Sequence, residues 1–145
     1  MSWQHFAAPP DAADIAVGFK LPTRAVQMSN VKARLFSLPK ESFHTHDTMA
    51  RALGLKVSVP QGLMCFGYLS QLCTEFFGEG WVRGGTFNIV FARMLQRDDL
   101  LTVGGVVTAI NAEAGKTGAK VTLDIWVDND RGERVTLGTA TGTLA

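Results

Sequence analysis

Two histidines, His44 and His46, are separated by one residue in the stretch FHTHDTMARALG. Imidazole titrates near neutrality and can accept and return a proton, so His44 is a candidate general acid or base. Two histidines at this spacing could also bind a metal, but the sequence offers no third ligand cluster, and we expect no metal site. We interpret His46 as a surface imidazole and Asp47 as a helix cap.

Gly62 stands in the segment VPQGLMCFG, where a long helix is predicted to begin. The first backbone N–H groups of a helix have no partner within it, and the helix dipole favours negative charge there. Glycine also lets a ligand approach the backbone closely. Gly62 is therefore a candidate donor to an oxyanion, although a turn after Pro60 explains the glycine equally well.

Four other charged residues are candidates for chemistry. Glu41 lies three residues before His44 and is either a partner for the imidazole or a solvated glutamate. Glu75 lies on the predicted long helix and is a candidate nucleophile or base. Arg83 and Arg93 could contact a phosphate, or they could be rim charges and structural ion pairs.

The residues before the long helix are predicted to form short elements. We expect an extended lead-in over residues 1–18, followed by one strand and two short helices, at 23–29, 29–39 and 46–54. In the first of these helices Val31, Leu35 and Leu38 lie near one face.

A long helix is predicted over residues 61–77, with apolar side chains around most of its circumference. Such a helix is typical of a protein core. Gly67 inside it suggests a close approach of the backbone to a sheet, because glycine otherwise destabilises a helix. Cys65 and Cys73 would lie about 12 Å apart along its axis, too far for a disulfide. Two unpaired buried thiols indicate a reducing compartment.

The remainder of the chain alternates between apolar and polar residues and is predicted to be β-structure. The expected strands are 86–94, 100–111, 119–129 and 134–144, joined by links that include 113–118 and 129–132. The Gly104–Gly105 pair suggests a bulge. One helix followed by a meander of about four strands predicts an α+β fold in which an antiparallel sheet curls around the helix.

Composition limits the classes of partner. The chain has 145 residues, which predicts a single domain over 1–145, and 46% of them are hydrophobic. A formal net charge of +1 gives no indication of nucleic-acid or membrane binding. The most apolar window, 57–77, contains Pro60 and Glu75 and indicates a buried helix rather than a membrane span. No signal peptide is apparent, so we expect a cytoplasmic protein.

The order and spacing of these motifs resemble the MaoC-like hydratase/dehydratase family. Five residues separate His44 from Ala50, and Gly54 is followed eight positions later by Gly62, as in that family. The segment FARMLQRDDLLTV is similar to the family's strand and following Gly-Asp turn, with Arg93 and Asp99 in register. The resemblance covers roughly residues 17–145.

This resemblance implies the hot-dog fold, in which an antiparallel sheet wraps around one long central helix. It also implies a hydratase or dehydratase acting on a 2-enoyl or 3-hydroxyacyl thioester. Coenzyme A or an acyl carrier protein would be the substrate carrier, no redox cofactor would be required, and a homodimer with its helices back to back is expected. His44 would be the acid/base, the Gly62 amide the oxyanion donor, and Leu63, Phe66 and Phe87 the lining of the acyl slot.

The catalytic aspartate of the family is missing. Its position, five residues before the histidine, is Pro39 here, and the family's histidine before the helix glycine is Gln61. Either Glu41 substitutes for the aspartate, or His44 works alone. Two other readings stay open: a non-catalytic acyl-binding or partner subunit of the same fold, and a thioesterase that uses Glu75.

Overall fold

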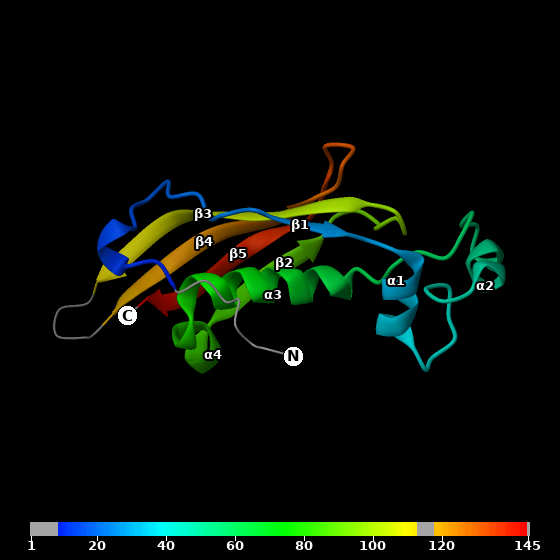
Figure 1. The fold of residues 1–145 in the computed structure, drawn as a ribbon, viewed down its shortest axis with the longest axis horizontal. Helices are drawn as coiled ribbons and strands as arrows, with labels where there is room; N and C mark the ends of the chain where they lie inside the picture. Colours follow the sequence, from blue (N-terminus) through cyan, green and yellow to red (C-terminus); the bar gives the residue numbers. More distant parts are fainter. Residues whose placement is uncertain (1–8, 113–117, 145) are drawn as a thin grey trace.

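A five-stranded antiparallel sheet is the body of the computed structural model, which describes residues 9–112 and 118–144 (Figure 1). Its strands are β1 (Arg24–Gln27), β2 (Thr86–Phe91), β3 (Leu100–Ala112), β4 (Ala119–Asp128) and β5 (Arg134–Leu144). Their order in the sheet is β1-β3-β4-β5-β2. The predicted meander holds for β3 to β5 but is wrong for β2, which pairs with β5 at the far edge. The segment 92–99 must therefore carry the chain across the end of the sheet before β3 begins.

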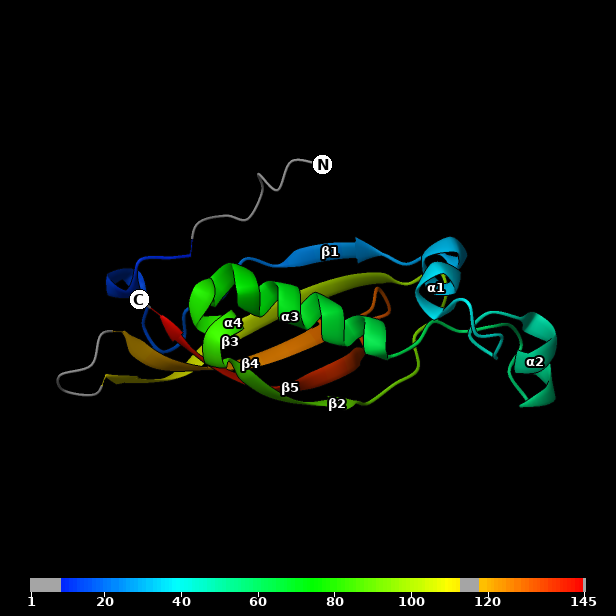
Figure 2. The ribbon, with the colours of Figure 1, turned by 90° about the horizontal axis from the view of Figure 1, so that it is seen from below.

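The long helix α3 (Leu63–Phe77) lies along one face of this sheet (Figures 1 and 2). Alternate side chains of β4 point toward it and are buried, as the sequence pattern predicted: Val121, Leu123, Ile125 and Val127. They share one hydrophobic core with the inner side of α3, formed by Met64, Cys65, Leu69, Leu72, Cys73, Phe76 and Phe77. The predicted α+β fold, with a sheet around one central helix, is confirmed.

The outer side of α3 is open, which corrects the expectation for Gly67. That glycine is exposed, and a side chain added to it would meet no atom within 4 Å. No strand crosses the helix there among the described residues. Leu63 and Phe66 lie on the same side and are also exposed. The helix is apolar on a face that the sheet does not cover.

The bulge in β3 is not at Gly104–Gly105, as the sequence suggested. These two glycines continue the regular pairing with Trp126 and Ile125 of β4, and the register shifts between Val107 and Ala109 instead. Gly104 leaves room for the indole of Trp126, which lies 3.0 Å from the place of a missing Cβ. The glycine pair is explained by close packing rather than by a bend.

Two short helices, α1 (Asn30–Ser37) and α2 (Asp47–Ala52), lie beyond one end of the sheet, next to the start of α3 (Figure 1). Ser29 caps α1, because its hydroxyl accepts a hydrogen bond from the Lys32 N–H at 3.2 Å. The face of α1 with Leu35 is exposed. A further helix, α4 (Glu79–Gly84), was not predicted and follows Gly78, which has a φ of 58°.

The remaining expectations concern the ends, links and cysteines. The lead-in contains a short 3-10 helix, η1 (Ala12–Asp14), while residues 1–8 and most of the 113–118 link lie outside the described residues. Cys65 and Cys73 are buried and free, and burial raises the pKa of Cys73 to about 12. In the described part of the chain, no helix is both long and apolar enough to cross a bilayer.

Candidate functional site

The His44 ring is held in one orientation by the segment that precedes α3. Its Nδ1 lies 2.8 Å from the carbonyl oxygen of Val59. A carbonyl can only accept, so in the neutral ring Nδ1 carries the proton and Nε2 keeps its lone pair. No other hydrogen bond to this ring is found among the described residues. The half-buried ring also packs on Phe43, with 3.9 Å between ring centroids.

His44 and Gly62 line one cavity of about 380 Å³. The cavity lies where the start of α3 meets the end of β2 and the segment that follows that strand. Its remaining lining residues are Phe43, Val59, Pro60, Leu63, Phe91, Ala92, Arg93, Met94 and Leu95. The structure therefore brings together the two residues that the sequence proposed as acid/base and oxyanion donor.

The backbone at Gly62 offers free donors. The N–H groups of Met64 and Cys65 already bond to the carbonyls of Gln61 and Gly62, at 3.0 and 2.9 Å. Within the described residues, no hydrogen bond is made by the N–H of Gly62 or of Leu63. Unpaired amides at the start of a fifteen-residue helix favour an anionic or strongly polarised oxygen.

Of the three residues expected to line the acyl slot, the structure places only one in the wall of the His44 cavity. Leu63 lines the cavity, whereas Phe66 and Phe87 pack edge to face, with 4.8 Å between ring centroids, and neither lines it. Phe91 takes their place in the wall. Its Cδ1 would lie 3.3 Å from a Cβ on Gly62, so only glycine leaves this ring undisturbed. Sequence patterns did not identify Phe91 as a lining residue, because its place beside Gly62 depends on the fold.

The carboxylate expected to help His44 lies elsewhere. The Glu41 side chain is 75% exposed and approaches His46, with 3.9 Å between Oε1 and Nε2. It lines a separate hollow beside α2. Of the described residues that line the His44 cavity, only His44 itself and Arg93 have titratable side chains. The structure does not place Glu41 beside His44.

Of the two residues that depart from the family pattern, Gln61 has a hydrogen-bond partner and Pro39 is exposed. Gln61 donates from its amide nitrogen to the Ser37 hydroxyl at 3.0 Å, so it ties the start of α3 to α1. Pro39 is exposed just after α1.

The two histidines bind different groups. The His46 ring lies beside the Thr45 hydroxyl, with Nδ1 to Oγ1 at 2.9 Å, while His44 binds a carbonyl. Within the described residues, no group of three or more potential metal ligands of the His, Cys, Asp and Glu types comes together.

Glu75 lies in a second cavity that shares no lining residue with the first. Its carboxylate pairs with the guanidinium of Arg24 and accepts a hydrogen bond from Gln71 at 3.2 Å. The cavity has a volume of about 490 Å³ and is otherwise lined mainly by apolar residues, among them Phe19 and Phe76. A carboxylate neutralised by an arginine is a weaker nucleophile than a free one.

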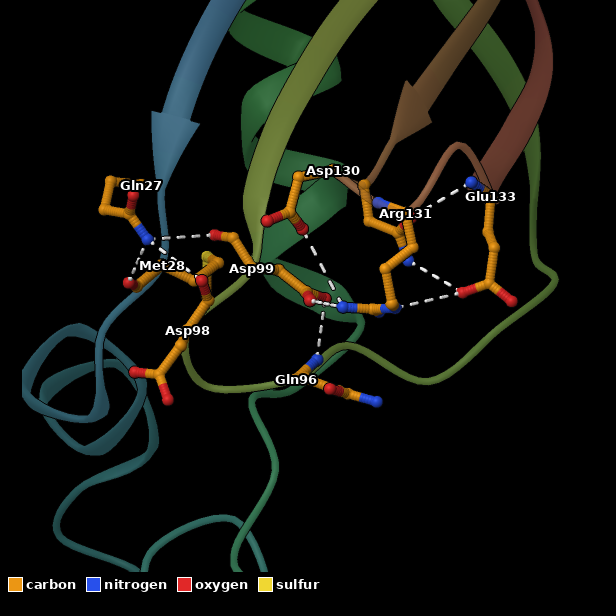
Figure 3. A network of polar contacts seen from close by, with 9 residues as sticks. Gln27, Met28, Gln96, Asp98, Asp99, Asp130, Arg131 and Glu133 are labelled. Atoms are coloured by element: carbon orange, nitrogen blue, oxygen red, sulfur yellow. Dashed lines mark hydrogen bonds and ion pairs between the residues drawn. The ribbon is translucent and has the colours of Figure 1, made fainter.

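Asp99, which the resemblance aligned with the family's turn, is a structural anchor (Figure 3). It is 1% exposed and accepts hydrogen bonds from the Gln96 N–H at 2.8 Å and from Arg131 at 2.5 Å. Arg131 also contacts Glu133, so the β4–β5 hairpin is fastened to the start of β3. Asp99 does not line the His44 cavity.

The two arginines considered as phosphate contacts differ in position. Arg83 forms an exposed pair with Glu79 on α4, with 2.9 Å between nitrogen and oxygen. It does not line the His44 cavity. Arg93 lines that cavity and lies 3.8 Å from Glu133, a loose contact in which the Arg93 side chain stays 60% exposed. Arg93 is the better placed of the two for an anionic ligand.

Asp47 does not cap α2, which corrects the sequence expectation. The N-cap position is His46, whose side chain makes no capping bond. The Asp47 carboxylate instead accepts from the Ser58 N–H at 2.9 Å and from Arg97 at 2.5 Å. These hydrogen bonds lower the pKa of Asp47 to about 2. An aspartate eleven positions from its amide partner could not be assigned from local spacing.

We expect Asp47 to stabilise the fold only while it is ionised. Its pKa is lowered from 3.8 to about 2, so its contribution is complete above the ordinary value and is lost as the pH falls through about 2. The urea midpoints of the wild type and Asp47→Asn should therefore differ at neutral pH and converge under strong acid. A difference between the two urea midpoints that stays constant from neutral pH to strong acid would show that the charge of Asp47 has no role.

Comparison with solved structures shows relatives of this fold. The MaoC-like dehydratase from Rhodospirillum rubrum gives a TM-score of 0.76 at 20% identity, covering 92% of this chain and 94% of that one. The R-hydratase PhaJ1 from Pseudomonas aeruginosa gives 0.74 at 19%, covering 91% and 83%. A chain of the ChsH1–ChsH2 complex from Mycobacterium tuberculosis gives 0.71 at 19%, covering 90% and 98%.

The sequence itself matches no family model and no curated protein. The structural likeness confirms, at the level of the fold, the resemblance to MaoC-like hydratases that the motifs suggested. At these identities the likeness concerns the fold, and the chemistry of this chain must be argued from its own cavity.

Proposed function

We propose that this protein adds water to a 2-enoyl thioester, or removes water from the 3-hydroxyacyl partner, at the His44 cavity. The observation that carries the proposal is that the His44 imidazole and the amides of Gly62 and Leu63 line the same cavity. Among the described residues, neither Nε2 nor these two amides have a hydrogen-bond partner. A base and an oxyanion site are the two groups that this chemistry requires.

In the hydration direction, His44 Nε2 takes a proton from a water molecule while the oxygen of that water bonds to C3 of the acyl group. The C2=C3 electron pair moves toward the thioester carbonyl, whose oxygen gains negative charge. The N–H groups of Gly62 and Leu63 stabilise that oxygen. The imidazolium then returns a proton to C2, so that water has added across the double bond and His44 is neutral again.

The hydrogen bond from Nδ1 to Val59 supports this cycle without a carboxylate. The carbonyl oxygen carries partial negative charge, which stabilises the imidazolium formed when Nε2 gains a proton. A neutral carbonyl stabilises this cation less than an aspartate would. Glu41 lies with His46, so we propose that His44 acts alone.

The acyl group or its carrier arm can continue into a neighbouring cavity. That cavity has a volume of about 520 Å³ and shares Val59, Met94 and Leu95 with the His44 cavity. Lys56 lies in its wall and Arg93 in the wall of the first. We propose that these cations face the phosphate of coenzyme A or of an acyl carrier protein.

The test is an assay that follows the enoyl absorbance and free thiol together, with crotonyl-CoA and a longer enoyl-CoA as substrates. Loss of absorbance without thiol release is the expected result. Thiol release that Glu75→Gln abolishes would favour the thioesterase. The absence of both signals, with measurable binding of an acyl thioester, would favour a non-catalytic subunit, a reading that the lack of a carboxylate in the cavity supports.

We also propose that the protein is a homodimer. β2 is an edge strand that lies beside α3 (Figure 2). The side of α3 that the sheet does not cover exposes Leu63, Phe66 and the bare backbone at Gly67. A second copy that pairs its own β2 here would extend the sheet and cover this apolar face, with the helices back to back. Two buried free thiols are consistent with a reducing compartment such as the cytoplasm.

Phe66→Glu is expected to convert the dimer into a monomer, because it places a charge at the centre of the proposed interface. Phe66 is 45% exposed in the single chain, so the isolated fold should tolerate the change. Leu35→Glu puts the same charge on an exposed apolar residue of α1 and should leave the dimer intact. Light scattering after size-exclusion chromatography gives the masses, and a Phe66→Glu variant that stays dimeric contradicts this interface.

A further inference from the structure

The carbonyl that orients His44 belongs to a segment held in place from several sides. Ser58 and Val59 are both buried. The Val59 N–H donates to the Phe43 carbonyl at 3.3 Å, and the Val59 carbonyl accepts from His44 Nδ1 at 2.8 Å. The two segments are thus linked by a pair of hydrogen bonds, one from the backbone and one from the imidazole. Any shift of Val59 would move the acceptor on which the tautomer of His44 depends.

Ser58 is fixed through its amide, its carbonyl and its hydroxyl. Its N–H donates to Asp47 Oδ1 at 2.9 Å. Arg97 donates from Nη2 to the Ser58 hydroxyl at 3.0 Å and from Nε to its carbonyl at 3.4 Å, and the same Nη2 binds Asp47 at 2.5 Å. Arg51 is the other charge near Asp47, at 3.9 Å.

Asp47 and Arg97 therefore both bind Ser58, the residue immediately before Val59. They come from different parts of the chain, Asp47 from α2 and Arg97 from the segment after β2 that also lines the His44 cavity. Neither of them lines that cavity, although Arg97 lines the neighbouring one. Both residues contact Ser58. The carbonyl that accepts the hydrogen bond from His44 belongs to the next residue, Val59.

We propose that Asp47 and Arg97 are positioning residues that hold His44 in its Nδ1–H tautomer by fixing the Ser58–Val59 segment. A neutral imidazole can carry its proton on either nitrogen, and the hydrogen bond to the other ring atom selects the tautomer. Only the Nδ1–H form leaves Nε2 able to accept a proton from water. The catalytic meaning of this inference rests on the proposed function, whereas the tautomer itself does not.

The tautomer can be read directly from the ¹⁵N chemical shifts of the His44 ring in the full-length protein at a pH above its titration. We expect the wild type to be in the Nδ1–H form, and Asp47→Asn and Arg97→Gln to move the ring toward a mixture with Nε2–H. If the enzyme is a hydratase, kcat should fall about 10- to 100-fold in both variants. In Asp47→Asn KM should change little, because a base is displaced while the binding walls stay. Arg97 lines the neighbouring cavity, so the KM comparison is made on Asp47→Asn alone. Arg83→Gln, which breaks the exposed pair with Glu79, is the matched control and should alter neither quantity.

Arg97→Lys is the rescue variant. It restores a cation beside Asp47 but lacks the planar fork that reaches Ser58 at two points, so it should recover part of the Nδ1–H population lost in Arg97→Gln. If Arg97→Gln does not fold, Arg97→Lys is tested in its place. The ¹⁵N chemical shifts of its His44 ring should then lie between those of the wild type and those of a free imidazole.

A His44 ring that remains Nδ1–H in the folded variants overturns the inference, even if their activity falls. So does a wild-type ring that is already in the Nε2–H form. Failure of the proposed function gives a different result: no thioester is turned over, while the tautomer still responds to Asp47 and Arg97.

Discussion

Replacing His44 with alanine is expected to lower kcat/KM for hydration of an enoyl thioester by about 10²- to 10⁴-fold, the usual contribution of a general acid/base. No other described side chain that lines the cavity can take this role, because the guanidinium of Arg93 donates hydrogen bonds and has no acceptor. The loss should appear mainly in kcat, since the walls that bind the acyl group are unchanged. Steady-state kinetics with crotonyl-CoA measures it.

His46→Ala is the matched control for this substitution. It removes an imidazole two positions away that contacts Thr45 and Glu41 and does not line the cavity. Its activity should stay within a few-fold of the wild type. Equal losses in both variants would indicate that the 42–46 turn had been disrupted, and an unaffected His44→Ala would remove His44 from the mechanism.

Replacing Leu69 with alanine is expected to lower the free energy of unfolding by about 2–5 kcal/mol, the range found for leucine removed from a packed core. Leu69 is 0% exposed at the centre of α3, where it packs against the sheet. The substitution removes apolar contacts and leaves a cavity. α3 packs on the sheet from Met64 to Phe77, so it cannot easily move to fill that cavity. Chemical denaturation gives the value.

Leu35→Ala makes the same chemical change at a side chain that is 69% exposed on α1. Its effect on the free energy of unfolding should stay within about 0.5 kcal/mol, because little apolar surface is buried there and alanine is the stronger helix former. If Leu35→Ala were as destabilising as Leu69→Ala, the apolar face of α1 would have to be covered in solution.

The elements with strong hydrophobic periodicity could be predicted from sequence. β4 alternates without interruption, and α3 carries apolar residues at helical spacing, so their type and approximate limits followed from the pattern. The position of β2 could not be predicted in this way. Periodicity describes which faces of a strand are apolar, and it does not determine which neighbour the strand pairs with across the sheet.

The candidate site was predictable only in part, for a related reason. The family resemblance implied that His44 and Gly62 act together, and the structure places both in one cavity. The roles of Glu41 and Phe66 depended on the direction in which each side chain points, which the fold decides. Asp47 looked like a local cap, but a tertiary contact with Ser58 supplied its partner instead.

The most direct measurement is a crystal structure with butyryl-CoA, a saturated thioester that cannot be hydrated. The account predicts its carbonyl oxygen within about 3 Å of the N–H of Gly62 or Leu63, with C3 beside Nε2 of His44. An acyl group bound instead in the cavity of Arg24 and Glu75, or turned away from His44, would contradict it.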